Sequence, residues 1–221
     1  MSDLRFSEEL LLLTLNEEKQ TFPSSSAVII KFGLPVAILY ELVEMGKLKL
    51  QGDTLEPISL EPIGDSLLDM VLDTLSQSDS SLKNSIARLS VKSRKYRALL
   101  INNLTQKQAI KEVLDKKNHF RIWYEKQLQQ TRMKLQEILM YDQEGDFRTR
   151  TLIALIYVCN YHKKIFKEKW GLRTMARQLK ELSKENVFAK ALKNTVKGTQ
   201  VHIIFTLIAF IIILLKELCS R

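Results

Sequence analysis

The feature that most constrains how this chain folds is an apolar run close to its end. Residues 201–215 carry only two polar side chains, His202 and Thr206, before Lys216 and Glu217 follow. A membrane-spanning helix needs about 20 predominantly apolar residues, so the run is short for a span, which is the competing interpretation. A helix that is apolar on every side and does not span a bilayer belongs at the centre of a globular core. We therefore predict a buried C-terminal helix around which the other helices pack.

Composition favours one mainly α-helical domain covering residues 1–221. Hydrophobic residues make up 45% of the chain, and only 7 Gly and 4 Pro interrupt it, so a compact helical core is expected rather than disorder. Cys159 and Cys219 are the only cysteines, which excludes a disulfide scaffold and suits a reducing compartment. The first residues lack the order of a secretory signal. We expect a cytoplasmic protein.

Charge is unevenly distributed along the chain. Positions 1–81 hold 14 acidic and 5 basic residues, a net charge of −9, whereas positions 92–134 hold 12 basic and 3 acidic residues, a net charge of +9. Positions 163–180 hold a further 7 basic residues and a single acidic residue, Glu168. Basic helix faces of this kind attract phosphates of lipids or nucleic acids, although a solvated surface without a partner produces the same pattern.

Capping signals mark several helix ends. Ser7 is expected to cap a first helix that carries Glu8 and Glu9 in its first turn. A second helix is predicted to begin at 33–35, with Pro35 in its first turn, and to end at Gly46. Asp65 and Asp146 are expected caps of later helices.

Two segments alternate with a period of two and predict short β-hairpins. The first covers residues 48–57, and the second pairs residues 109–114 with residues 119–124. In the second hairpin, Phe120, Ile122 and Tyr124 share one side. Because each hairpin follows a helix, the helix-then-hairpin unit occurs twice.

Motifs for catalysis are missing from the sequence. It contains no glycine-rich phosphate loop, no paired-histidine metal motif and no nucleophile elbow. Cys159 and His162 stand three residues apart on a predicted helix, but no second ligand pair accompanies them, so we expect packed side chains, no metal and no cofactor. The sequence indicates a protein that is not an enzyme.

A winged helix that binds nucleic acid is an alternative, because that module also follows a helix with a basic hairpin. Lys116, Lys117 and Arg121 would then lie on the wing. The helix before this hairpin, however, ends in the uncharged segment 99–104, whereas a recognition helix carries base-reading polar side chains along one face. Nucleic-acid binding is therefore not our expectation.

Four segments, in order along the chain, resemble the Golgi phosphoprotein 3 family. They are residues 8–15 (EELLLLTL), 33–42 (GLPVAILYEL), 62–69 (PIGDSLLD) and 150–157 (RTLIALIY). The resemblance covers nearly the whole chain. It implies a largely helical domain built around a buried hydrophobic helix near the C-terminus. Without the long leader of the eukaryotic proteins, the chain looks like a bacterial member, in which a Golgi role does not arise.

Eukaryotic members of that family are peripheral Golgi proteins that bind phosphatidylinositol 4-phosphate through a basic pocket and also bind glycosyltransferase tails. The resemblance places Pro23 and Pro35 where those members have the tryptophan and one arginine of the pocket. It matches Arg150, with Arg148 nearby, to the arginine pair before the apolar run at 152–157. A hairpin contributes to self-association in the family, and the matching residues here are Lys116, Lys117, Phe120, Ile122 and Tyr124.

These observations predict a peripheral membrane protein that is not an enzyme, on the cytoplasmic face of a membrane. Arg148 and Arg150 are the expected contacts to an anionic, phosphoinositide-like headgroup. We also expect a homo-oligomer formed through the hairpin, and a protein-binding adaptor without lipid specificity remains an alternative. The basic surface that would meet the membrane consists of Arg94, Lys95, Arg97, Lys163, Lys164 and Lys167.

Overall fold

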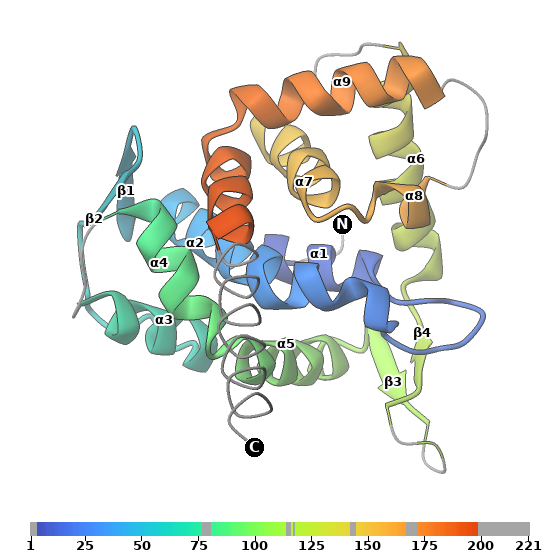
Figure 1. The fold of residues 1–221 in the computed structure, drawn as a ribbon. Helices are drawn as coiled ribbons and strands as arrows, with labels where there is room; N and C mark the ends of the chain where they lie inside the picture. The colour runs from blue at the N-terminus through green and yellow to red at the C-terminus, as the bar shows by residue number, and fades with distance from the viewer. Residues whose placement is uncertain are drawn as a thin grey trace, which may run out of the picture.

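The computed structural model describes residues 4–76, 81–113, 116, 118–141, 145–166 and 172–198. Helices make up most of this part of the chain and two antiparallel hairpins complete it (Figure 1), which confirms the predicted mainly helical fold. The helices are α1 (Phe6–Leu13), α2 (Leu34–Glu44), α3 (Ser66–Ser76), α4 (Leu82–Ser90), α5 (Ser93–Gln106), α6 (Glu125–Tyr141), α7 (Phe147–Val158), α8 (His162–Ile165) and α9 (Leu172–Glu185), and residues 187–198 are also helical. The strands are β1 (Leu48–Gln51), β2 (Thr54–Pro57), β3 (Ile110–Glu112) and β4 (Phe120–Ile122).

Helix α2 and the turns that lead into it are surrounded by other elements. The short 3-10 turn η1 (Ser24–Ser26) and the π-helical turn η2 (Ile29–Gly33) precede α2, in which every residue from Leu34 to Leu42 is buried. Helices α1, α3, α4 and α5 and strand β1 all contact α2, and Figure 1 shows α2 between these elements. α2 is therefore a central helix of the described structure.

The segment Ser24–Glu44 is long and apolar enough to cross a membrane, but 72% of its apolar window is buried inside the protein. Such burial is typical of a core helix. The sequence predicts the core helix at residues 201–215, and that segment lies outside the described residues. Within the described ranges, α2 is an apolar helix that other elements surround.

The predicted caps at Asp65 and Asp146 are confirmed, whereas the predicted cap at Ser7 is wrong. The Asp65 carboxylate accepts hydrogen bonds from the backbone N–H groups of Leu67 and Leu68, both at 3.0 Å. The N-cap of α1 is Arg5. Ser7 lies inside α1, where its N–H and Oγ both donate to Glu41 Oε1, at 2.6 and 2.7 Å.

The two predicted hairpins are present. In the first, Gln51 pairs with Thr54 across a turn at Gly52, which has a φ of +57°. In the second, Ile110 pairs with Ile122, and both strands are shorter than the sequence suggests. The second hairpin is tied to the loop after α1, because the Phe120 N–H donates to the Gln20 carbonyl at 2.7 Å. This contact joins the loop to β4, and Phe22 of the same loop contacts Arg97 of α5.

Gly33, at the end of η2, lies against helix α7. A Cβ at this position would lie 3.4 Å from Cys159 Sγ and 3.4 Å from Ile29 Cγ2, which are van der Waals contact distances. The η2 turn thus packs against the end of α7. The same turn carries Ile30 and Lys31.

Candidate anion-binding site

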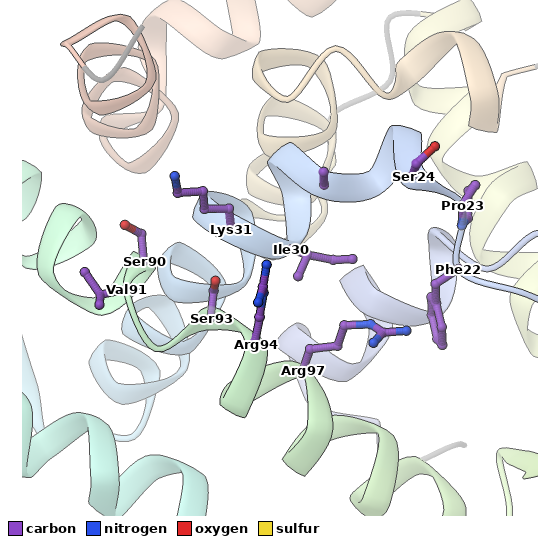
Figure 2. Close-up of a pocket in the computed structure, with 11 residues that line it drawn as sticks. Phe22, Pro23, Ser24, Ile30, Lys31, Ser90, Val91, Ser93, Arg94 and Arg97 are labelled. Atoms are coloured by element: carbon purple, nitrogen blue, oxygen red, sulfur yellow. The ribbon is translucent and has the colours of Figure 1, made fainter. Parts of the chain in front are cut away.

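A pocket of about 880 Å³ lies between the first turns of α5 and the segment that runs from the end of the α1 loop to η2 (Figure 2). Lys31 comes from η2, Arg94 and Arg97 come from α5, and Pro23 and Ser24 come from the loop and η1. Figure 2 shows Arg94 directed toward the η2 side and Arg97 directed toward Phe22. The lining residues are Phe22, Pro23, Ser24, Ala27, Ile30, Lys31, Ser90, Val91, Ser93, Arg94 and Arg97.

The three cations of this pocket form no ion pair with any described residue. Within the part of the chain that the structure describes, no carboxylate forms an ion pair with Lys31, Arg94 or Arg97. Some basic residues elsewhere in the described structure do form ion pairs, as in the contact of Lys107 with Glu8 at 2.8 Å. The pocket therefore concentrates positive charge that the described protein residues do not neutralise.

Arg97 shows the strongest departure from an ordinary surface arginine. Its guanidinium carbon lies 4.9 Å from the centre of the Phe22 ring, a cation–π distance. Its Nε is buried and finds no hydrogen-bond acceptor among the described residues. Burial lowers the pKa of Arg97, because the charged form loses hydration. A buried donor without an acceptor costs free energy, which an incoming anion would recover.

The Phe22 ring is itself held by the second hairpin. Phe22 and Phe120 have ring centres 5.4 Å apart in a tilted arrangement, and Phe120 is buried. Together with the hydrogen bond from Phe120 to Gln20, this contact fixes the loop against β4. The hairpin thus contributes to the site indirectly, by positioning the ring on which Arg97 stacks.

The amino end of α5 adds a second source of positive potential. Ser93 and Arg94 belong to the first turn of this 14-residue helix, and both line the pocket. Backbone N–H groups in a first helical turn have no partner within the helix and favour a bound anion. The turn is fixed from outside, because Lys92 Nζ donates to Thr74 Oγ1 on α3 at 3.1 Å. The geometry suits a phosphate group.

Arg148 and Arg150, the predicted headgroup contacts, lie on α7 and do not line this pocket. Arg148 pairs with Glu9 of α1 at 2.5 Å and lies over the Phe6 ring at 5.4 Å. Arg150 pairs with Glu185 of α9 at 2.7 Å. The two arginines therefore bind carboxylates on different neighbouring helices and do not converge on one point.

The structure separates the predicted basic surface into parts. Arg94 and Arg97 enter the pocket, and Lys95 is exposed on the same helix outside the lining. Lys163 and Lys164 are exposed on α8 and line no part of the pocket. Lys167 lies outside the described residues.

The hairpin residues fall into buried and exposed groups. Phe120 and Ile122 belong to the hydrophobic core, and Tyr124 packs against it and donates its hydroxyl to the Lys107 carbonyl at 3.1 Å. Lys116 is exposed, and Lys117 lies outside the described residues. Among the described residues of the hairpin region, Trp123 is a large apolar side chain that is exposed. Self-association through this region stays a prediction, and Trp123 is one side chain available for it.

Cys159 and His162 have the surroundings of packed side chains. Cys159 is buried, and burial raises the pKa of its thiol to about 12. The His162 ring lies 5.1 Å from the Tyr157 ring, and burial lowers its pKa. In the described ranges, no group of three or more His, Cys, Asp or Glu side chains has an arrangement that could hold a metal ion.

Sequence reasoning missed Lys31 and Phe22 as parts of the site. Arg94 and Arg97 are three residues apart, and this spacing predicts that they lie on one face of a helix. Lys31 comes from a π-helical turn more than 60 positions earlier in the chain. No local sequence pattern predicts that turn. Such turns are frequent at functional sites.

The fold and the pocket define a mainly helical protein with an unneutralised cationic site, a type of site that binds anions. The family profile of Golgi phosphoprotein 3 (GPP34) matches residues 6–199, and the chain belongs to this family. A search of curated proteins found no match. Membership suggests a binding role rather than catalysis and association with a membrane periphery.

Proposed function

We propose that this protein binds the phosphorylated headgroup of an anionic, phosphoinositide-like lipid in the α5 pocket, and so attaches reversibly to the cytoplasmic face of a membrane without catalysing a reaction. The observation that carries the proposal is Arg97, a partly buried arginine whose Nε has no described partner. It lies beside Arg94 and Lys31, which form no ion pair with a carboxylate in the described ranges. An arginine fork matches phosphate oxygens in a bidentate manner, and a volume of about 880 Å³ falls in the usual range of ligand pockets.

Family resemblance supports the same pocket. Pro23, which takes the place of the family's pocket tryptophan, lines it together with the two α5 arginines. Pro35, matched to a pocket arginine of the family, is buried in the first turn of α2 and does not line the cavity. We therefore assign the phosphate contacts to Arg94 and Arg97 in preference to Arg148 and Arg150, whose charges are already paired.

Vesicle sedimentation tests the proposal directly. Because each cation near an anionic surface contributes about 1 kcal/mol, Arg94→Gln and Arg97→Gln should each weaken binding to phosphoinositide vesicles about fivefold. Arg150→Gln is the matched control, because it removes an equal charge from an exposed ion pair with Glu185. Its vesicle affinity should stay within about twofold of the parent.

Three results would contradict the assignment. If Arg150→Gln weakens binding more than the α5 variants, the contact lies on α7, as the sequence alone suggested. If the protein ignores phosphoinositide and phosphatidylglycerol vesicles at low salt but retards duplex DNA, the nucleic-acid alternative replaces the membrane function. If it binds neither, the adaptor alternative remains.

A further inference from the structure

Val91 is an apolar side chain on the rim of the headgroup pocket, and it is 83% exposed. Single exposed hydrophobic residues are common and need no function by themselves. Val91 differs because it lines a cationic pocket, where Figure 2 shows it at the end opposite Pro23. Its place next to charged groups, rather than its exposure alone, calls for an explanation.

The backbone around Val91 is well supported. Val91 is the C-cap residue of α4, and its N–H donates to the Arg88 carbonyl at 3.3 Å. The next N–H, from Lys92, donates to the Leu89 carbonyl at 3.0 Å, and α5 begins one residue later. These hydrogen bonds hold the backbone of the turn between the two helices. Insertion of the valine into an apolar phase would therefore cost little conformational entropy.

Basic residues follow this valine closely in the sequence, and others line the same pocket. Lys92, Arg94 and Lys95 follow it within four positions, and Lys31 lines the same pocket from η2. An exposed apolar side chain beside cations is complementary to a bilayer surface, where anionic phosphates lie directly above acyl chains. A soluble phosphorylated molecule would gain from the cations but would offer the valine no apolar phase.

We propose that Val91 inserts among the acyl chains of an anionic bilayer while Arg94, Arg97 and Lys31 hold a headgroup phosphate. The inference rests on the proposed function, and it adds that the ligand is bound as part of a membrane. It also orients the protein, with the α4–α5 turn as the edge that enters the lipid.

Paired binding measurements test the insertion. The probes are phosphatidylcholine vesicles doped with phosphatidylinositol 4-phosphate, and a water-soluble inositol bisphosphate that carries no acyl chain. Val91→Ser should weaken vesicle binding about three- to tenfold, because a buried valine contributes on the order of 1 kcal/mol or more, and should leave affinity for the soluble probe unchanged. Val91→Trp should tighten vesicle binding alone.

The control is Ile58→Ser, since Ile58 is a β-branched residue that is 61% exposed and does not line the pocket. It should bind vesicles like the parent. Circular dichroism checks that each variant is folded. The insertion is refuted if Val91→Ser keeps parental vesicle affinity, or if it weakens the soluble probe equally. The proposed function fails separately, if Arg97→Gln leaves both probes bound as in the parent.

Discussion

Glu41 illustrates at the scale of one residue how burial changes chemistry. Its carboxylate is buried in α2, where Oε1 accepts from both donors of Ser7 and Oε2 has no partner among the described residues. Burial raises the pKa of Glu41 to about 7, because loss of hydration outweighs the two hydrogen bonds from Ser7 and the nearby positive charge of Arg5. The group therefore titrates close to neutral pH.

This shift predicts stability that depends on pH. The folded pKa lies above the ordinary value of 4.5, so the folded state binds the proton more tightly. The contribution of Glu41 is fully present below about pH 4.5 and is lost as the pH rises through about 7. Denaturant unfolding should show a lower free energy of unfolding at about pH 8 than at about pH 6, by about 1 kcal/mol.

Glu41→Gln removes the titrating group and keeps an oxygen that accepts from Ser7. Its unfolding free energy should change less between the two pH values than that of the parent. Glu44→Gln is the control, because Glu44 is an exposed carboxylate near the end of α2. It accepts a hydrogen bond from the Tyr40 hydroxyl at 2.6 Å. An equal pH dependence in parent and Glu41→Gln would show that other groups are responsible.

At the scale of elements, the second hairpin supports a site that it does not enter. Phe120 of β4 contacts Phe22, and Phe22 carries Arg97 on its face. The chain of contacts links β4 to α5 through a loop that is distant from both in sequence. Exchange of one aromatic ring in this chain should therefore affect the pocket more than the fold.

Phe22→Leu tests the coupling. It keeps an apolar side chain but removes the ring, so the cation–π contribution of about 0.5–1 kcal/mol is lost and headgroup affinity should fall about threefold. In an Arg97→Gln background the same change should have little effect, as a double-mutant cycle would reveal. Trp123→Leu provides the control, since Trp123 is exposed beside the same hairpin and does not line the α5 pocket. Additive effects of Phe22→Leu and Arg97→Gln would refute the coupling.

At the scale of the whole molecule, some acidic residues of the N-terminal region pair with basic residues of later helices. Acidic residues of α1 and the following loop pair with the later basic helices. The pairs are Glu8 with Lys107, Glu9 with Arg148, and Glu17 with Arg132. Among the described residues, Arg94, Arg97 and Lys31 line the pocket and take part in none of these pairs.

Salt should therefore weaken vesicle binding mainly by screening the cations of the pocket. Added salt from about 50 to about 500 mM shortens the range of charge interactions, so vesicle binding by the parent should weaken at least about tenfold. The Arg94→Gln/Arg97→Gln variant should show a much smaller dependence when its weaker binding is measured over the same range. The same dependence in both proteins would place the membrane contact on other cations, such as Lys163 and Lys164.

The sequence by itself determined the local architecture, because periodicity, caps and turns act over a few residues. The caps at Asp65 and Asp146, the apolar faces of the helices and both hairpins were predictable for this reason. The cap at Ser7 was not, since its donors are taken by Glu41, which lies 34 positions later.

Only the tertiary structure decided which basic residues form the site. Sequence spacing makes Arg148 and Arg150 as plausible as Arg94 and Arg97, but the fold places carboxylates beside the first pair and an aromatic ring and an open pocket beside the second. Whether a cation has an ion-pair partner depends on residues that packing brings next to it from distant positions in the sequence. Electrostatic energy falls with distance in space and not with separation along the chain, so this outcome could not be read from local pattern.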